Sequence, residues 1–271
     1  EKVRGFGPEM LCFNLTTYMF HDTMKWLRHF KDCLGIPVLA GGINLLIYPE
    51  ETLSHPEIDF AVIGEAMPAV KEFLDAYQNG ESYENISGLA YREDGELRIN
   101  TPGKYRIKFD EYPFPARELL DNSLYYEHIS QLRNFTIGLT STGCPYRCEF
   151  CAIPDKPYSA RSVENILAEV EECYNKYSIR EIDYFDAVFT INRKRTARFC
   201  EGLLESDFKI AWSCRARPDN LDRDVLRLMA KSGCKRIYMG IETAEGGILE
   251  NLNKRFSLEQ VEQAIDMCRE V

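Results

Sequence analysis

The stretch Thr140-Ser141-Thr142-Gly143-Cys144-Pro145-Tyr146-Arg147-Cys148-Glu149-Phe150-Cys151 places three cysteines within eight residues. Thiolates packed this closely repel one another and oxidise readily, so such a cluster is typical of a metal site. Gly143 and Pro145 disfavour a helix through the first cysteine, and we expect a loop after a strand over 134–140. The stretch therefore predicts a metal-binding loop at the end of a strand.

The number of cysteines in this loop bears on which metal it binds. A structural zinc ion takes four ligands, commonly from two cysteine pairs or from one pair and two histidines, and no second pair exists here. Three thiolates on a 4Fe-4S cluster leave one iron free for a substrate or cofactor. Two alternatives stay open: a zinc site that takes Cys173, Cys214 or Cys234 as its fourth ligand, and an electron-transfer cluster with a fourth cysteine.

The spacing Cys144-x3-Cys148-x2-Cys151, with Phe150 before the last cysteine, resembles the signature of the radical S-adenosylmethionine (SAM) enzymes. The resemblance implies that the three cysteines hold a 4Fe-4S cluster whose fourth iron binds the amino and carboxylate groups of SAM. One electron then cleaves the sulfonium and gives a 5′-deoxyadenosyl radical. It also implies that Phe150 lies beside the adenine.

Length and composition set the broad class of the chain. Its 271 residues and 45% hydrophobic content are sufficient for two α/β domains. A formal net charge of −10 argues against nucleic acid as the main partner, and no apolar run approaches the length of a membrane span. Ten cysteines without a pairing pattern favour a reducing compartment, so we expect a cytoplasmic protein.

The N-terminal part alternates strands and helices. Apolar runs at 10–14, 36–40 and 58–63 predict strands, and helical periodicity between them predicts a Rossmann-like parallel sheet over 1–100. Asp94-Gly95 predicts a tight hairpin at the end of this domain. Prolines and the loss of periodicity over 101–133 predict a linker.

The turns that follow the first two of these strands resemble those in the later half of a cobalamin-binding domain. The resemblance implies that Thr16, Thr17, Gly41 and Gly42 line a pocket for the nucleotide tail of cobalamin. Hydroxyl residues and glycines also end strands in any such sheet, which is the alternative. The motif Asp-x-His-x-x-Gly, which supplies a histidine to cobalt, is absent, so either this member binds cobalamin without it or an N-terminal segment is missing.

The C-terminal part, 134–271, repeats strand-helix units. Strands are expected over 134–140, 181–185, 208–212 and 236–239, and four units of one kind predict a partial parallel (β/α) barrel. The active site of such a barrel lies at the carboxyl ends of its strands.

Three residues at these strand ends match the radical SAM pattern. The resemblance implies that Asp186 contacts the amino group of SAM, that Arg217 rather than Arg215 pairs with its carboxylate, and that Glu242 binds the ribose hydroxyls. The alternative for each is a helix cap or a surface ion pair.

The sequence thus predicts a radical SAM enzyme with a 4Fe-4S cluster, SAM and cobalamin as cofactors. The resemblance implies a small-molecule substrate and an electron donor such as flavodoxin or ferredoxin. Methyl transfer through cobalamin is the favoured reaction, with oxidative cyclisation and a non-enzymatic zinc-binding module as alternatives. The family pattern continues beyond Val271, so we expect a chain truncated at both ends.

Overall fold

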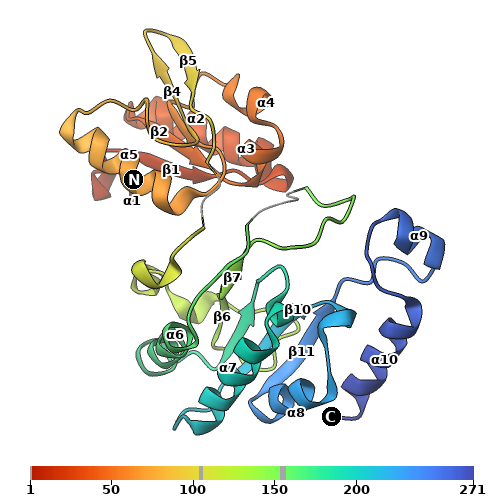
Figure 1. Cartoon of the computed structure of the whole chain (residues 1–271). Coiled ribbons are helices and arrows are strands. Elements are labelled where there is room, and N and C mark those ends of the chain that lie inside the picture. The colour runs from red at the N-terminus through yellow and green to blue at the C-terminus, as the bar shows by residue number, and fades with distance from the viewer. Residues whose placement is uncertain (1, 104–105, 153–156) are drawn as a thin grey trace. The chain divides into compact units, whose positions relative to one another are not determined.

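The computed structural model describes residues 2–103, 106–152 and 157–271 (Figure 1). The chain divides into two compact units, 1–107 and 108–271. Each unit is an α/β structure with its own sheet and its own hydrophobic core. Within the described residues, no helix is both long enough and apolar enough to cross a membrane.

The N-terminal unit contains one sheet in the order β1-β2-β3-β4-β5. Strands β1 to β3 are parallel, whereas β4 and β5 form the antiparallel hairpin that the Asp-Gly pair predicts, with positive φ at both turn residues. The strand bounds are β1 Leu11–Asn14, β2 Val38–Gly41, β3 Phe60–Val62, β4 Leu89–Glu93 and β5 Glu96–Ile99. The helix bounds are α1 Lys2–Phe6, α2 Phe20–Leu34, α3 Ile43–Ile47, α4 Pro49–Leu53 and α5 Ala66–Asn79.

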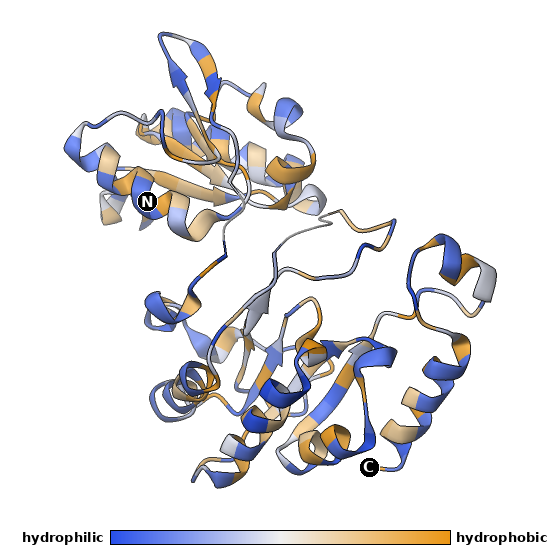
Figure 2. Ribbon diagram, in the orientation of Figure 1, coloured by the Kyte–Doolittle hydropathy of each residue, from blue (hydrophilic) through white to orange (hydrophobic). Residues whose placement is uncertain are grey.

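Helices cover both faces of this sheet, because alternate strand residues point to opposite sides. Val38 and Ala40 of β2 belong to the cluster that α2, α3 and α4 also enter, while Leu39 belongs to the cluster around Phe73 of α5. Figure 2 shows the parallel strands of this sheet mostly in apolar colours, whereas β5 at its edge is exposed and includes polar residues. The predicted Rossmann-like domain is therefore confirmed as an α/β fold.

The C-terminal unit contains a parallel sheet in the order β6-β9-β10-β11. Its strands are β6 Phe135–Gly138, β9 Glu181–Tyr184, β10 Ala211–Ala216 and β11 Cys234–Met239. Between β6 and β9 in the sequence, β7 Ser141–Thr142 and β8 Ser159–Ala160 form a separate antiparallel pair. Its helices are α6 Val163–Lys176, α7 Arg193–Glu205, α8 Arg223–Lys231, α9 Gly246–Asn251 and α10 Leu258–Arg269. Strands in chain order, each followed by a helix, make the partial (β/α) barrel that the sequence predicts.

The two faces of this sheet differ in chemistry. Ile182, Trp212 and Phe199 belong to the apolar core beneath α6, α7 and α8. Asp183 and Ser213 are register partners on the opposite face, and both are buried. The predicted third strand, 208–212, lies too early, because the polar residues Ser213 and Arg215 made the second half of β10 look like a loop.

The segment over 101–133 also differs from the expected linker. Residues up to 107 belong to the N-terminal unit, and residues from 108 onward belong to the C-terminal unit. Arg117 is buried there, and the backbone amides of Gln131 and Leu132 donate to the Glu181 carboxylate at 2.8 and 2.9 Å. Three short 3-10 helices, Phe109–Glu111, Arg117–Leu119 and Asn122–Leu124, and bonds between side chains and backbone hold the segment. Elements this short leave no period in the sequence.

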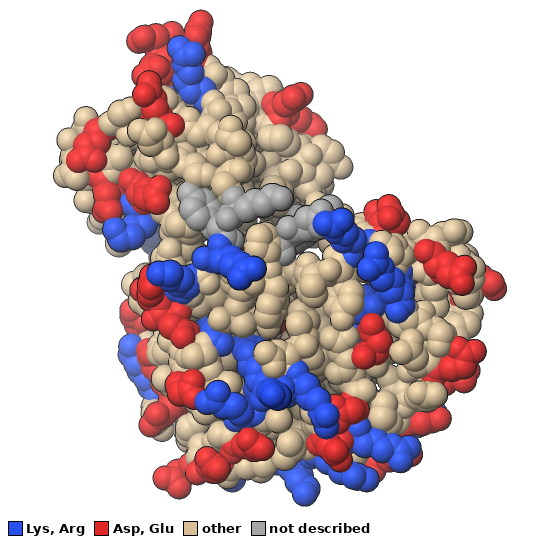
Figure 3. Space-filling model, in the orientation of Figure 1, with Lys and Arg blue, Asp and Glu red and all other residues tan. Residues whose placement is uncertain are grey.

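The surface of the C-terminal unit carries interleaved charges of both signs, as Figure 3 shows. Arg198 of α7 pairs with Glu164 of α6 at 2.5 Å, and Arg193 pairs with Asp222 at 2.8 Å. These two basic side chains therefore have acidic partners.

Candidate active site

The three cysteines of the loop line one cavity of about 430 Å³. The cavity lies at the carboxyl ends of β9, β10 and β11, where a parallel barrel places its site. Phe150 of the cysteine loop also lines it. The other lining residues come from the ends of these strands and from the loop after α9, among them Ala187, Arg215, Arg217, Tyr238, Glu242 and Lys254. The structure therefore gathers most of the predicted site residues in one place.

Asp186 is the exception, and its predicted contact with SAM needs correction. Its side chain is fully buried and does not line the cavity. One carboxylate oxygen accepts the backbone amide of Thr140 at 2.7 Å, and the other accepts the hydroxyls of Thr140 and Ser141. With its oxygens committed to these donors, Asp186 fixes the start of the cysteine loop instead of meeting a ligand.

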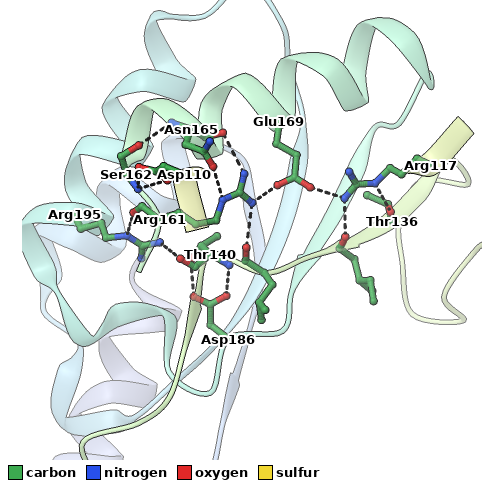
Figure 4. A network of polar contacts seen from close by, with 12 residues as sticks. Asp110, Arg117, Thr136, Thr140, Arg161, Ser162, Asn165, Glu169, Asp186 and Arg195 are labelled. Carbon is green, nitrogen blue, oxygen red and sulfur yellow. Dashed lines mark hydrogen bonds and ion pairs between the residues drawn. The ribbon is translucent and has the colours of Figure 1, made fainter. Parts of the chain in front are cut away.

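A buried polar network continues outward from Thr140 (Figure 4). Arg195 donates to the carbonyl oxygens of Thr140 and Arg161 at 2.7 and 3.2 Å. Arg161 in turn pairs with Glu169 of α6, and Glu169 also pairs with Arg117 at 2.7 Å. Arg117 and Arg161 thus share the one buried carboxylate of Glu169, and the network ties α6, α7 and the 108–133 segment to the cysteine loop.

The other end of the cysteine loop rests on residues Leu252–Phe256, which we call the clasp. The Glu149 amide donates to the Leu252 carbonyl at 3.1 Å, and the Asn253 side chain donates to the Arg147 carbonyl at 2.6 Å. Asn253 and Arg255 adopt positive φ, which reverses the chain twice within the clasp. Sequence reasoning missed this element, because a short irregular segment after a helix carries no periodic signal.

Lys254 of the clasp is a site residue that the sequence analysis did not identify. It is buried, and its ammonium donates to the Gly240 carbonyl at 2.9 Å and to Glu242 at 3.0 Å. The same ammonium lies 5.0 Å from the centre of the Phe150 ring. Lys254 thus joins two of the predicted SAM contacts, Glu242 and Phe150.

Glu242 lies just after β11 in a conformation uncommon for a residue with a side chain. Its φ is +70°, a region that costs a non-glycine residue free energy and often marks functional sites. Its side chain is 38% exposed, so its second oxygen remains open to a ligand. This geometry suits a carboxylate that accepts hydrogen bonds from hydroxyl groups.

The two arginines at the end of β10 are held differently. Arg217 is buried, and its Nε and Nη2 donate to the two oxygens of Asp219 at 2.9 and 3.0 Å. Its guanidinium also lies 3.6 Å from the centre of the Tyr146 ring. Within the described part of the chain, Arg215 donates only through its Nη1, to Asp183 and, at 3.0 Å, to the Tyr184 carbonyl.

The cysteines separate into two groups by environment. Cys173, Cys200 and Cys214 are fully buried in the core beneath the helices, and burial raises the pKa of Cys173 to about 11 and that of Cys200 to about 12. Cys144, Cys148 and Cys151 are partly exposed in the cavity. None of Cys173, Cys214 and Cys234 lines the cavity, which counts against each of them as the fourth ligand of a zinc site there.

The three loop thiols lie near enough to one another to interact electrostatically. The pKa of the Cys144 thiol is raised, mainly by burial and further by the nearby Cys148 and Cys151. The Tyr146 amide and Arg217 offset part of this rise. Among the described residues, no three histidine, cysteine or carboxylate side chains lie close enough to hold a single metal ion. Because an iron-sulfur cube binds each thiolate through a different iron, it takes thiolates further apart than zinc does.

The residues predicted to contact cobalamin lie together at the carboxyl end of the N-terminal sheet. The Leu15 amide donates to the Gly41 carbonyl at 2.7 Å, so the turn of Thr16 and Thr17 borders that glycine. Gly42 has a φ of +108°, and a Cβ at this position would lie 2.2 Å from the Asn14 side chain. The fold therefore requires glycine at position 42. A Cβ on Gly41 would meet nothing, which leaves space above it for a ligand.

Comparison with known proteins finds a family model that matches most of the C-terminal unit. Residues 139–271 match the model of the Radical SAM superfamily. "Uncharacterized methyltransferase PH0819" of Pyrococcus horikoshii is 29% identical over 272 residues, which cover 98% of this chain and 59% of that protein. "Anaerobic magnesium-protoporphyrin IX monomethyl ester cyclase" of Rubrivivax gelatinosus is 25% identical over 279 residues, which cover 100% of this chain and 50% of that protein. The chain thus spans about half to three fifths of these relatives' length.

Solved structures share the fold of both units. The cobalamin-dependent SAM radical enzyme OxsB matches with a TM-score of 0.80 and 20% identity over 98% of this chain and 40% of its own. The radical SAM methyltransferase TsrM of Kitasatospora setae, solved with cobalamin and a [4Fe-4S] cluster, matches with a TM-score of 0.76 and 18% identity. The match covers 97% of this chain and 55% of TsrM.

Proposed function

Because residues 139–271 form a radical SAM domain, we propose that this chain holds the SAM-cleaving site of a cobalamin-dependent radical methyltransferase. The observation that carries the proposal is the placement of Cys144, Cys148 and Cys151 around one cavity with Phe150 and Glu242. A 4Fe-4S cluster, when bound there, supplies the single electron that cleaves the SAM sulfonium. The protein's part is to orient SAM and exclude water.

Each cavity residue has a role in that binding. Phe150 offers a ring face to the adenine, and Glu242 accepts hydrogen bonds from the ribose hydroxyls. Arg217 turns its Nη1, which has no hydrogen-bond partner among the described residues, toward the SAM carboxylate. Lys254 holds the Glu242 side chain in position through its hydrogen bond before SAM arrives.

The N-terminal unit is the proposed cobalamin-binding domain, with Thr16, Thr17 and Gly41 beside the nucleotide tail. The open space over Gly41 supports this role, as does the shared fold with a methyltransferase solved with cobalamin. Gly42 contributes by letting the two turns approach each other rather than by touching the ligand. A cytoplasmic location, a small-molecule substrate and a flavodoxin or ferredoxin donor remain predictions.

Substitution at Gly41 tests cobalamin binding directly. Gly41→Val fills the space above the turn without striking the protein, so we expect an unchanged melting temperature but at least tenfold weaker binding of hydroxocobalamin. Gly5→Val, also in open space, is the control. Equal cobalamin affinity in both variants would contradict the proposed pocket.

The alternative reaction is an oxidative cyclisation, which the names of the cyclase relatives favour. The two reactions use SAM differently, because a methyltransferase consumes one SAM as methyl donor and releases S-adenosylhomocysteine. The reconstituted chain, incubated anaerobically with SAM and a reductant, should form S-adenosylhomocysteine only when cobalamin is added. Release of 5′-deoxyadenosine without any cobalamin-dependent S-adenosylhomocysteine would favour the cyclase.

A further inference from the structure

Arg215 presents hydrogen-bond donors to the cavity that no described residue accepts. Its Nη1 serves Asp183 and the Tyr184 carbonyl, but no described residue accepts a hydrogen bond from its Nε or Nη2. These two groups form one edge of the guanidinium, with the spacing that binds two oxygens of a carboxylate or phosphoryl group. In Arg217 the same edge is already closed by Asp219.

The rest of the site holds this edge rigidly in place. Asp183 is fully buried, and its Oδ1 also accepts the Ser213 hydroxyl at 2.7 Å, while its Oδ2 has no hydrogen-bond partner among the described residues. The guanidinium lies 3.7 Å from the centre of the Phe185 ring and 4.6 Å from that of Tyr238. Rings beside the guanidinium plane limit its hydration, so the open edge is its main route to a partner.

We propose that Arg215 binds an oxyanion, a carboxylate or a phosphoryl group, of the substrate that reacts in this cavity. This inference rests on the proposed function, because it takes the cavity of the three cysteines to be the place of reaction. Two other cations line the cavity: Arg217 is paired with Asp219, and Lys254 is engaged with Glu242 and Gly240. Arg215 therefore selects for acidic substrates and fixes the orientation in which they meet SAM.

The test measures binding of small probes to the reconstituted chain in the presence of saturating SAM. Benzoate and phenylphosphonate carry the oxyanion, and benzamide is the neutral probe of the same shape as benzoate. We expect at least one oxyanion to bind tenfold or more tightly than benzamide by calorimetry. Arg215→Lys keeps the positive charge beside Asp183 but removes the paired Nε and Nη2 donors, so it should abolish that difference in affinity. The matched substitution Arg227→Lys at an exposed position should leave the difference unchanged.

A second variant protects the test against misfolding of the first. Phe185 is 51% exposed, so Phe185→Leu should leave the fold intact while removing the ring beneath Arg215, with severalfold weaker oxyanion binding. No preference for oxyanions over benzamide in the unmodified chain would overturn the inference. A tenfold loss of SAM affinity in Arg215→Lys would also overturn the inference, because it would assign the Nε and Nη2 donors of Arg215 to the SAM carboxylate. Failure of the proposed function would appear instead as an absent cluster or absent SAM binding before any probe is added.

Discussion

Asp186 is the residue on which the start of the cysteine loop depends. Asp186→Ala would leave the Thr140 amide and two hydroxyls buried without their acceptor. We expect the free energy of unfolding to fall by about 3 kcal/mol, measured by urea denaturation, because hydrogen bonds to a buried charge are costly to lose. The exposed Asp207→Ala is the control. A variant of normal stability that binds SAM poorly would instead restore the role predicted from sequence.

Glu242 is the residue whose change should affect SAM alone. Glu242→Gln keeps an acceptor for Lys254 but removes the charge that strengthens hydrogen bonds to the ribose hydroxyls. We expect SAM to bind about tenfold more weakly, a difference of about 1.4 kcal/mol, with the iron content unchanged. Calorimetry on the reconstituted chain measures this, with the exposed Glu250→Gln as control. SAM affinity equal to that of the control would refute the role.

The buried thiols predict how stability depends on pH. Burial raises the pKa of Cys173 to about 11, above its value near 9 in the unfolded chain. The unfolded state therefore loses this proton first, and the stabilisation that is complete below pH 9 is lost as pH rises toward 11. We expect a decline of about 1.4 kcal/mol per pH unit from this thiol, measured by urea unfolding. Cys173→Ala should show a shallower decline, and an identical slope in both proteins would contradict this assignment.

At the scale of elements, the clasp and the cysteine loop are expected to act as one unit. Asn253→Ala removes the bond to the Arg147 carbonyl and places alanine at a φ of +55°, which costs about 1 to 2 kcal/mol. Amide hydrogen exchange should therefore speed up in the peptide that contains Glu149, whose amide bonds to the clasp. Asn251→Ala, at the exposed end of α9, should leave that peptide unchanged. Unchanged exchange in Asn253→Ala would separate the two elements.

Elements with a strong period or cap could be predicted from the sequence. The helix that begins after Ser257 has the expected capping box, and Gly35 ends α2 in the left-handed conformation. The second half of β10 and the 108–133 segment could not be predicted, because buried polar side chains stabilise them through partners distant in sequence. Lys254 was missed for the same reason, because its partners Gly240 and Glu242 lie in the segment that directly follows β11.

At the scale of the whole molecule, the two units have separate cores. Residues such as Trp212 and Phe199 fill the C-terminal core, and Leu27 and Phe73 fill the N-terminal ones. A fragment of residues 108–271 should therefore fold and accept the cluster without binding cobalamin. Far-ultraviolet circular dichroism, iron analysis and cobalamin titration of the fragment check this. A fragment that stays unfolded would show that the units depend on each other.

The central claim is that Cys144, Cys148 and Cys151 hold a 4Fe-4S cluster open to SAM. Iron and sulfide analysis after anaerobic reconstitution tests it most directly, in the unmodified chain, in Cys148→Ala and in the core variant Cys173→Ala. We predict about four irons and four sulfides per chain in the unmodified protein and in Cys173→Ala, and neither in Cys148→Ala. One tightly bound zinc ion per chain, or loss of the metal in Cys173→Ala, would contradict the claim.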